Sequence, residues 1–152
     1  MRKAIHLFLL VLAPLAANAV ESQSGAAFDE THALIVNSGS TNFQGFSLVL
    51  SADGEATLEQ GNSTSQSYLP QTLVARLFAD LRVAGALDAL PPSRCMKSAS
   101  FGTATRIVYR GKSSPDISCP SPNPLLRRLA IDVMSLLGAA KISATRRPGH
   151  AP

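Results

Sequence analysis

The stretch FSLVLSADGEATLEQ, residues 46–60, decides the fold because its residue order alone predicts a β-hairpin. Every second residue of its first half is apolar (Phe46, Leu48, Leu50), which is the period of a strand with one buried face. Asp53-Gly54 follows, and both residue types tolerate the positive φ of a tight hairpin turn. Residues 55–60 alternate again and predict the returning strand.

Beyond this hairpin the chain predicts a polar loop over residues 61–67 and then a helix, for which Pro70 suits the first turn. Gly85 is a typical C-terminal stop. The apolar stripe of this helix has the spacing of one helical face. It consists of Leu73, Val74, Leu77, Phe78 and Leu81.

The second half repeats the order of hairpin and helix. Residues 105–110 alternate, residues 111–115 predict a turn, and residues 116–119 predict a short returning strand. Asn123 is a good N-cap and Pro124 a good first residue of the closing helix, which we expect to end at Gly138. Its apolar face consists of Leu125, Leu126, Leu129, Val133, Leu136 and Leu137. Residues 33–36 predict a possible extra strand ahead of the first hairpin.

Each predicted hairpin and each predicted helix is apolar on one face only. Such elements favour an α+β fold: an antiparallel sheet of four or five strands with two α-helices packed on one face. The side chains expected under the helices are Phe46, Leu48, Leu50, Leu58, Ile107 and Tyr109. The side chains expected on the open face are Ser47, Val49, Glu55, Thr57, Glu59, Arg106, Val108 and Arg110. If the two hairpins are neighbours, the glutamates of one lie near the arginines of the other.

This order of elements resembles that of small exported bacterial domains of unknown function. The resemblance is carried by residues 45–48, by Asp53-Gly54, by the stripe of residues 73–81 and by residues 105–111, and it spans roughly residues 33–137. It implies the same fold, and it transfers no functional residue.

The N-terminal segment predicts a signal peptide over residues 1–19, with Arg2 and Lys3 ahead of an apolar run and Ala-Asn-Ala at 17–19 before cleavage between Ala19 and Val20. An N-terminal membrane anchor is the alternative, and no second apolar run of membrane-spanning length follows. We therefore expect an exported protein, periplasmic or secreted, without a membrane span after processing. Its parts would be a flexible lead-in (20–30), one α+β domain (31–141) and a disordered tail (142–152).

Charge is segregated along the chain. Residues 20–93 hold eight acids and two bases, whereas residues 94–152 hold two acids and ten bases. The acids and bases between residues 20 and 141 balance, so we expect no nucleic-acid partner. Arg128 has Asp132 one helical turn ahead as a partner. Arg94, Lys97 and Lys112 have no evident acidic partner, and we expect them to form a patch that contacts an anionic envelope component or an acidic protein.

Few residues suit catalysis, and no catalytic residue, metal ligand or cofactor is predicted. His32 and His150 lie far apart, and Gly61-Asn62-Ser63-Thr64-Ser65 lacks the second glycine of a nucleophile elbow. Cys95, between Arg94 and Lys97, has the positive neighbours of a reactive thiolate. An exported chain with two cysteines usually pairs them, however, so a Cys95–Cys119 disulfide is expected.

These features favour a non-catalytic interaction module that binds an unknown protein or an envelope component. One alternative is a small hydrolase-like enzyme that uses the Ser/Thr-rich segment 98–105. A structural accessory protein without a ligand is the other.

Overall fold

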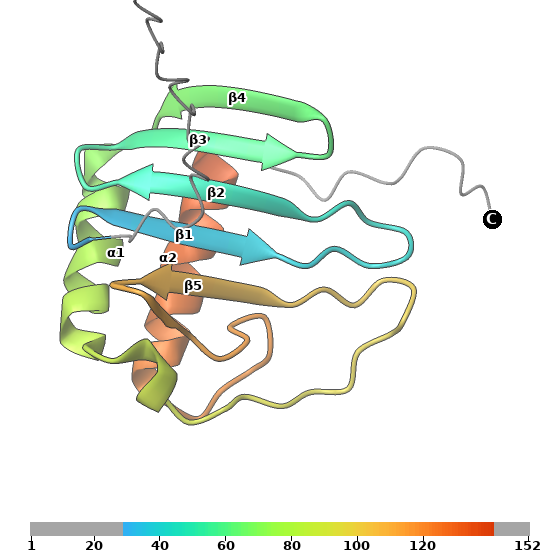
Figure 1. Ribbon diagram of the computed structural model, residues 1–152. Coiled ribbons are helices and arrows are strands. Elements are labelled where there is room, and N and C mark those ends of the chain that lie inside the picture. Colours follow the sequence, from blue (N-terminus) through green and yellow to red (C-terminus); the bar gives the residue numbers. More distant parts are fainter. Residues whose placement is uncertain (1–28, 142–152) are drawn as a thin grey trace, which may run out of the picture.

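Residues 29–141 are the part of the chain that the computed structural model describes, and they form the elements shown in Figure 1. In chain order these are β1 (His32–Asn37), β2 (Phe46–Ser51), β3 (Glu55–Gln60), β4 (Ser63–Tyr68), α1 (Gln71–Ala84), the 3-10 turn η1 (Leu87–Ala89), β5 (Thr105–Tyr109), β6 (Lys112–Ser113) and α2 (Pro124–Ala139). The predicted signal peptide with its cleavage site, most of the lead-in and the predicted tail lie outside the described residues.

The strands form one antiparallel sheet in the order β4-β3-β2-β1-β5-β6. Both α-helices lie behind this sheet in the view of Figure 1, so they cover one face, and no helix of residues 29–141 covers the other, which we call the open face. The predicted α+β class with two helices on one face is confirmed. The sheet has six strands rather than four or five.

β1 lies inside the sheet, although its sequence marks it only as a possible strand ahead of the first hairpin. Ile35 pairs with Leu48 of β2 on one side and with Ile107 of β5 on the other. Ala33 and Ile35 are fully buried. β1 therefore joins the two predicted hairpins, and β2 and β1 together separate β3 from β5.

Residues 63–68 form β4, which corrects the prediction of a loop over 61–67. Gly61, with a φ of 61°, makes the tight turn that leads from β3 into β4. Every residue of β4 is exposed, so the strand is held by its backbone ladder with β3 and buries no side chain. A strand of this kind has no hydrophobic period by which it could be recognised.

The second hairpin is also shorter than predicted. Arg110 and Gly111 have φ values of 50° and 70° and turn the chain at once, so that β6 falls within the predicted turn 111–115. Residues 116–119 form no strand, because the Asp116 carboxylate accepts hydrogen bonds from the backbone N–H groups of Thr105 (3.0 Å) and Ser118 (3.0 Å). The Ile117 N–H still donates to the Thr105 carbonyl (2.9 Å), so the Asp116 side chain replaces a strand partner only as the acceptor for the Thr105 N–H.

The core lies between the helices and the covered face of the sheet. Leu48, Leu50, Ile107 and Tyr109 are buried there as predicted, and Phe46 and Leu58 are partly buried against the same cluster. Phe78 of α1 meets the Tyr109 ring edge-on, with 6.0 Å between centroids. This apolar layer fixes which side chains remain on the open face.

The helix ends follow local signals. α1 stops before Gly85, whose φ is 63°, and α2 starts after Asn123, whose side-chain oxygen accepts from the backbone N–H groups of Leu125 (2.9 Å) and Leu126 (3.1 Å). Both ends are as predicted. The other end of α2 is not, because the helix continues through Gly138 to Ala139.

Two ion pairs join the helices to each other. Arg76 of α1 contacts Asp132 of α2, and Arg128 of α2 contacts Asp80 of α1 at 3.0 Å. The predicted pair between Arg128 and Asp132 within α2 is wrong, because Asp132 is buried at the helix interface and Arg128 reaches across to α1.

Candidate functional site

The predicted Cys95–Cys119 disulfide is present and joins the segment after α1 to the segment before α2, with 5.5 Å between the two Cα atoms. Neither cysteine of the described chain is free. Cys95 therefore has no thiol to serve as a nucleophile. Its contribution is to position the residues around it.

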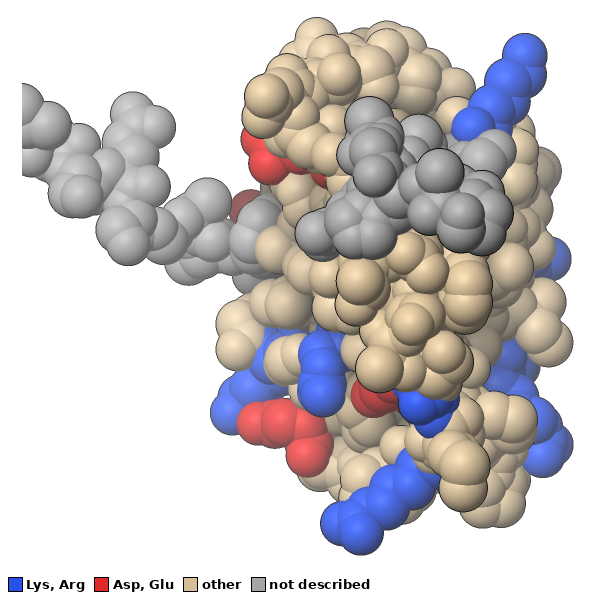
Figure 2. All heavy atoms as spheres, turned by 90° about the vertical axis from the view of Figure 1, so that its right-hand side faces the viewer, with Lys and Arg blue, Asp and Glu red and all other residues tan. Residues whose placement is uncertain are grey.

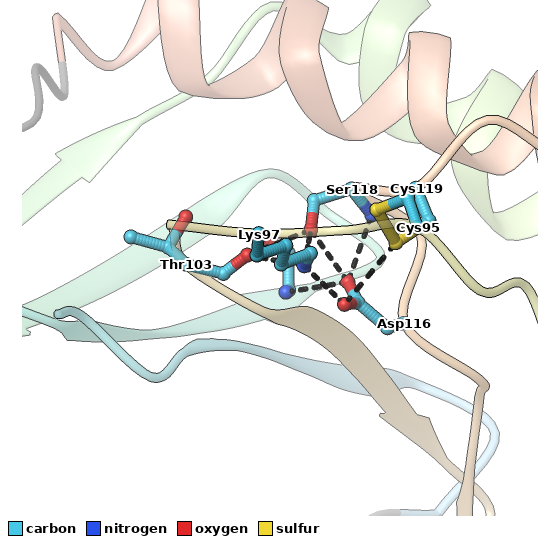
Figure 3. Close-up of a disulfide and its surroundings, with 7 residues drawn as sticks. Cys95, Lys97, Thr103, Asp116, Ser118 and Cys119 are labelled. Carbon is cyan, nitrogen blue, oxygen red and sulfur yellow. Dashed lines mark hydrogen bonds and ion pairs between the residues drawn. A yellow bond between two sulfur atoms is a disulfide. The ribbon is translucent and has the colours of Figure 1, made fainter. Parts of the chain in front are cut away.

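Lys97, Thr103, Asp116 and Ser118 meet beside this disulfide (Figure 3). The Lys97 ammonium contacts the Asp116 carboxylate and the Thr103 carbonyl, and it donates to the Ser118 hydroxyl at 2.7 Å. Burial acts to raise the pKa of Asp116, but hydrogen bonds from Lys97, Ser118 and the Thr105 backbone outweigh burial and leave the pKa below its usual value. The cluster ties the loop before β5 to the loop before α2.

A serine beside a lysine can form a catalytic dyad, but this pair is arranged differently. Lys97 directs N–H groups at three oxygen acceptors, so its nitrogen offers no lone pair to the Ser118 hydroxyl. A general base needs that lone pair. The geometry of Lys97 and Ser118 fits a cross-link between two loops.

The hydroxyls of Ser98, Thr103 and Thr105 in the Ser/Thr-rich segment 98–105 also have structural partners. The Asn37 side chain donates to the hydroxyls of Thr103 (3.2 Å) and Thr105 (2.9 Å), and the Ser98 hydroxyl accepts from the Ser100 backbone (3.2 Å). An open hollow of about 440 Å³ lies next to this segment. The structure places no histidine and no free cysteine among the residues that line it.

The three bases of the predicted cationic patch have different surroundings. Lys97 pairs with Asp116, and Lys112 of β6 pairs with Asp88 of η1 at 2.9 Å. Arg94 is exposed and has no ion pair with any residue between 29 and 141. The expectation that Lys97 and Lys112 lack acidic partners is wrong, because the fold brings together segments that are far apart in sequence.

The open face of the sheet carries four adjoining aliphatic side chains, Leu34, Val36, Val49 and Val108. Leu34 of β1 pairs with Val49 of β2 and with Val108 of β5, and Val36 follows Leu34 on the same face. Each is partly buried by its neighbours. Neither α1 nor α2 covers them, since both helices pack on the other face. We call these four residues the Leu34 patch.

Charges of opposite sign flank the Leu34 patch. Glu55 and Glu59 lie on β3, Arg106 lies on β5, and Arg110 follows β5 in the turn to β6. The predicted pairing between these glutamates and arginines is wrong, because three strand spacings, about 14 Å, separate β3 from β5. Arg110 instead contacts Glu30 at 2.7 Å.

A hollow of about 190 Å³ on the same face is lined by His32, Ser51 and Glu55, together with Val49 and Thr57. His32 pairs in register with Ser51. The sequence does not predict this hollow, because its lining depends on the register between β1 and β2.

The histidine of this hollow also has a carboxylate partner. His32 Nδ1 lies 3.2 Å from the Asp29 carboxylate. Hydrogen bonds from the Thr31 side chain and backbone, and then from His32, lower the pKa of Asp29 to about 2.

These residues do not form a hydrolase triad. The Ser51 hydroxyl contacts the Asp53 carboxylate and lies 3.1 Å from the Glu55 carbonyl, so its proton points to those acceptors. Nucleophilic activation requires a hydrogen bond from the serine to the histidine.

Figure 2 shows one end of the molecule, and most of the charged side chains visible in it lie toward the lower part and the sides. Two loops join here. The Ser38 N–H donates to the Ala104 carbonyl (2.9 Å), and the rings of Phe43 and Phe101 lie 5.8 Å apart. Phe101 and Met96 are exposed beside the hollow next to the disulfide.

Between residues 29 and 141, no three His, Cys, Asp or Glu side chains are grouped so that they could hold a metal ion. Within the same range, neither helix has the length and apolarity to cross a membrane. Comparison of the chain with protein-family models, curated proteins and solved structures finds no match.

Proposed function

We propose that this chain is an exported, non-catalytic interaction module that binds a protein partner through the open face of its sheet. The Leu34 patch is the observation that carries the proposal. Contiguous apolar patches rimmed by polar residues mark protein-binding surfaces. The Leu34 patch is contiguous, and each of its side chains is partly exposed.

The charges around the Leu34 patch indicate the chemistry of the partner. Glu55 and Glu59 flank the patch on one side and Arg106 flanks it on the other. A complementary partner has an apolar centre, a basic group that faces β3 and an acidic group that faces β5. Such an arrangement fixes the orientation of a partner more than it adds to affinity.

Export is supported by two independent features. The disulfide is compatible with an oxidising compartment, where such bonds persist. The first nineteen residues have the order of charge, apolar run and small residues that is typical of a signal peptide. The partner is therefore sought among periplasmic or secreted proteins.

The test compares two valine-to-arginine variants in affinity capture from the exported fraction. Val49→Arg places a charge within the Leu34 patch, whereas Val83→Arg makes the same change at an exposed valine of α1. We expect a protein that the parent and Val83→Arg retain to be absent from the Val49→Arg sample, as measured by quantitative mass spectrometry.

A second arm tests the charges. Arg106→Glu should reduce capture of the same protein, because it places like charges opposite the acidic group of the partner. Equal capture by parent, Val49→Arg and Arg106→Glu would show that the open face binds nothing, and the proposal would fail.

A further inference from the structure

β4 is the outermost strand on one side of the sheet, and all six of its residues are exposed. It pairs with β3 without interruption, from Gln60 opposite Ser63 to Glu55 opposite Tyr68. The other side of β4 faces no strand within the described chain.

One hydrogen bond shows which backbone groups of β4 are unpaired. The Leu69 N–H donates to the Gly54 carbonyl at 2.9 Å, directly beyond the β3–β4 ladder. Bonded and non-bonded pairs alternate in an antiparallel ladder, so Ser63, Ser65 and Ser67 occupy the bonded pairs with β3. The N–H and C=O groups of Thr64, Gln66 and Tyr68 therefore point away from β3, off the edge of the sheet.

This edge lacks the features by which proteins prevent pairing between sheets. Charged residues, proline and bulges usually protect such strands. Residues 60–75 contain no charged residue, β4 contains no proline, and its register with β3 is continuous. The opposite edge, by contrast, is the two-residue strand β6, in which Lys112 pairs with Asp88 of η1.

We propose that β4 pairs with β4 of a second copy of this chain, antiparallel and about a two-fold axis. In one register all the outward groups are used: Gln66 faces Gln66 of the second copy, and Thr64 faces Tyr68 of the second copy on either side of the axis. Three bonded pairs of two hydrogen bonds each result. In the two neighbouring registers that still place outward-pointing N–H and C=O groups opposite each other, only two such bonded pairs form.

We assign a second copy of this chain as the partner because β4 is compatible with pairing to its own copy. An uncharged strand meets its own copy without repulsion between like charges. A two-fold contact also closes on itself and leaves no free β4 edge on which further copies could add.

The pairing has a consequence for the proposed binding face. Residues opposite each other in an antiparallel pair point to the same face of a sheet. Gln66 pairs with Thr57, which is next to the Leu34 patch on the open face. The two Leu34 patches would thus lie on the same side of one continuous sheet, and a partner with two binding sites would engage both.

The test uses opposite charges at the two-fold axis. Gln66→Lys and Gln66→Glu each place like charges across the axis, on Cα atoms about 5.5 Å apart. By light scattering after size exclusion, over a concentration series, we expect the parent to be dimeric and each variant alone to be monomeric. A one-to-one mixture of the two variants should recover the dimer, because the charges then attract.

Thr57→Lys is the matched control. It adds the same charge on the same face, one strand further in, so that the two lysines of a dimer lie about 14 Å apart. That distance exceeds the screening length of about 8–10 Å near physiological salt, and we expect this variant to remain dimeric. Far-UV circular dichroism checks that all variants are folded.

A parent that is monomeric over the whole series overturns the proposal. So does a Gln66→Lys protein that dimerises as the parent does, or a mixture that stays monomeric. Equal partner capture by the parent, Val49→Arg and Arg106→Glu with the dimer intact would instead overturn only the open-face proposal, so the two proposals fail separately.

Discussion

Asp132 shows how a single residue connects the two helices. Its side chain is buried on α2, one of its carboxylate oxygens contacts Arg76 of α1, and the other has no hydrogen-bond partner among residues 29–141. Burial raises the pKa of Asp132, and the Arg76 guanidinium only partly opposes this effect. A raised pKa means that the folded state binds a proton at a pH where the unfolded chain has released it. This carboxyl therefore favours folding more as the pH falls toward its unfolded pKa.

Arg76→Ala tests this coupling. The change leaves a buried carboxylate without its partner, and we expect a loss of about 1–3 kcal/mol in the free energy of unfolding at pH 7. The loss should shrink as the pH is lowered, because a growing fraction of the unpaired Asp132 is then protonated in the folded state. Urea unfolding at a series of pH values measures both effects.

Arg82→Ala is the control for this prediction, since Arg82 is an exposed arginine of the same helix. It should change stability by less than about 0.5 kcal/mol at any pH. A loss in Arg76→Ala that is the same at pH 5 and pH 7 would contradict the role assigned to Asp132.

The disulfide is the second feature at this scale. Cys95 and Cys119 are 24 residues apart in sequence. In the chain-entropy model, closing a loop of this size stabilises the fold by roughly 3–4 kcal/mol. The double variant Cys95→Ser/Cys119→Ser should lose about this much, as measured by urea unfolding. The parent treated with reductant should match it.

Thiol labelling supplies the check on this prediction. The parent, denatured without reductant, should take up no label, whereas the reduced parent should take up two. Labelling of both cysteines in the unreduced protein would contradict the disulfide.

At the scale of elements, side-chain oxygens determine where structure begins and ends. Asn123 starts α2 by accepting two backbone N–H groups, and Asp116 replaces a strand by accepting from the N–H groups of Thr105 and Ser118. The two cases differ in range. A cap acts within three residues and can be recognised from sequence, while Asp116 acts on a residue eleven positions away.

Asn123→Ala should destabilise the protein by about 1 kcal/mol, because two N–H groups at the start of α2 lose their acceptor. Asn123→Asp should retain most of the stability, since a carboxylate accepts the same hydrogen bonds and suits the positive end of the helix dipole. Urea unfolding of the three proteins decides the matter. Equal stability of Asn123→Ala and the parent would show that the cap does not hold this helix end.

At the scale of the whole molecule, the segregated charges of the sequence are matched between its two halves. Glu30 pairs with Arg110, Asp80 with Arg128, and Asp88 with Lys112. The acids come from the first half and the bases from the second. Each exposed pair contributes only about 0–1 kcal/mol, so their effect is to balance the surface charge rather than to hold the fold.

Processing is the prediction that belongs to the whole chain. Because Ala-Asn-Ala at 17–19 precedes a polar stretch, the exported protein should begin at Val20. Intact mass spectrometry of the protein from the exported fraction measures this directly. A mass that includes residues 1–19 would favour the membrane anchor instead.

The sequence by itself determined the features that depend on neighbours along the chain or on simple pairing. The first hairpin, both helices, the ends of these helices at Gly85 and Asn123, and the disulfide follow from period, turn residues and an even cysteine count. Local propensity and hydrophobic period act within a few residues, so they can be evaluated before the chain folds.

The position of β1, the existence of β4 and the acid that each base contacts depend on the folded chain. β4 has no apolar period, and Asp132 meets Arg76 from 56 residues away. The Leu34 patch likewise requires β1 to lie between β2 and β5. Backbone ladders and ion pairs can form with any suitable partner that lies close enough in space. Which partner lies close is decided when the core is buried between the helices and the sheet.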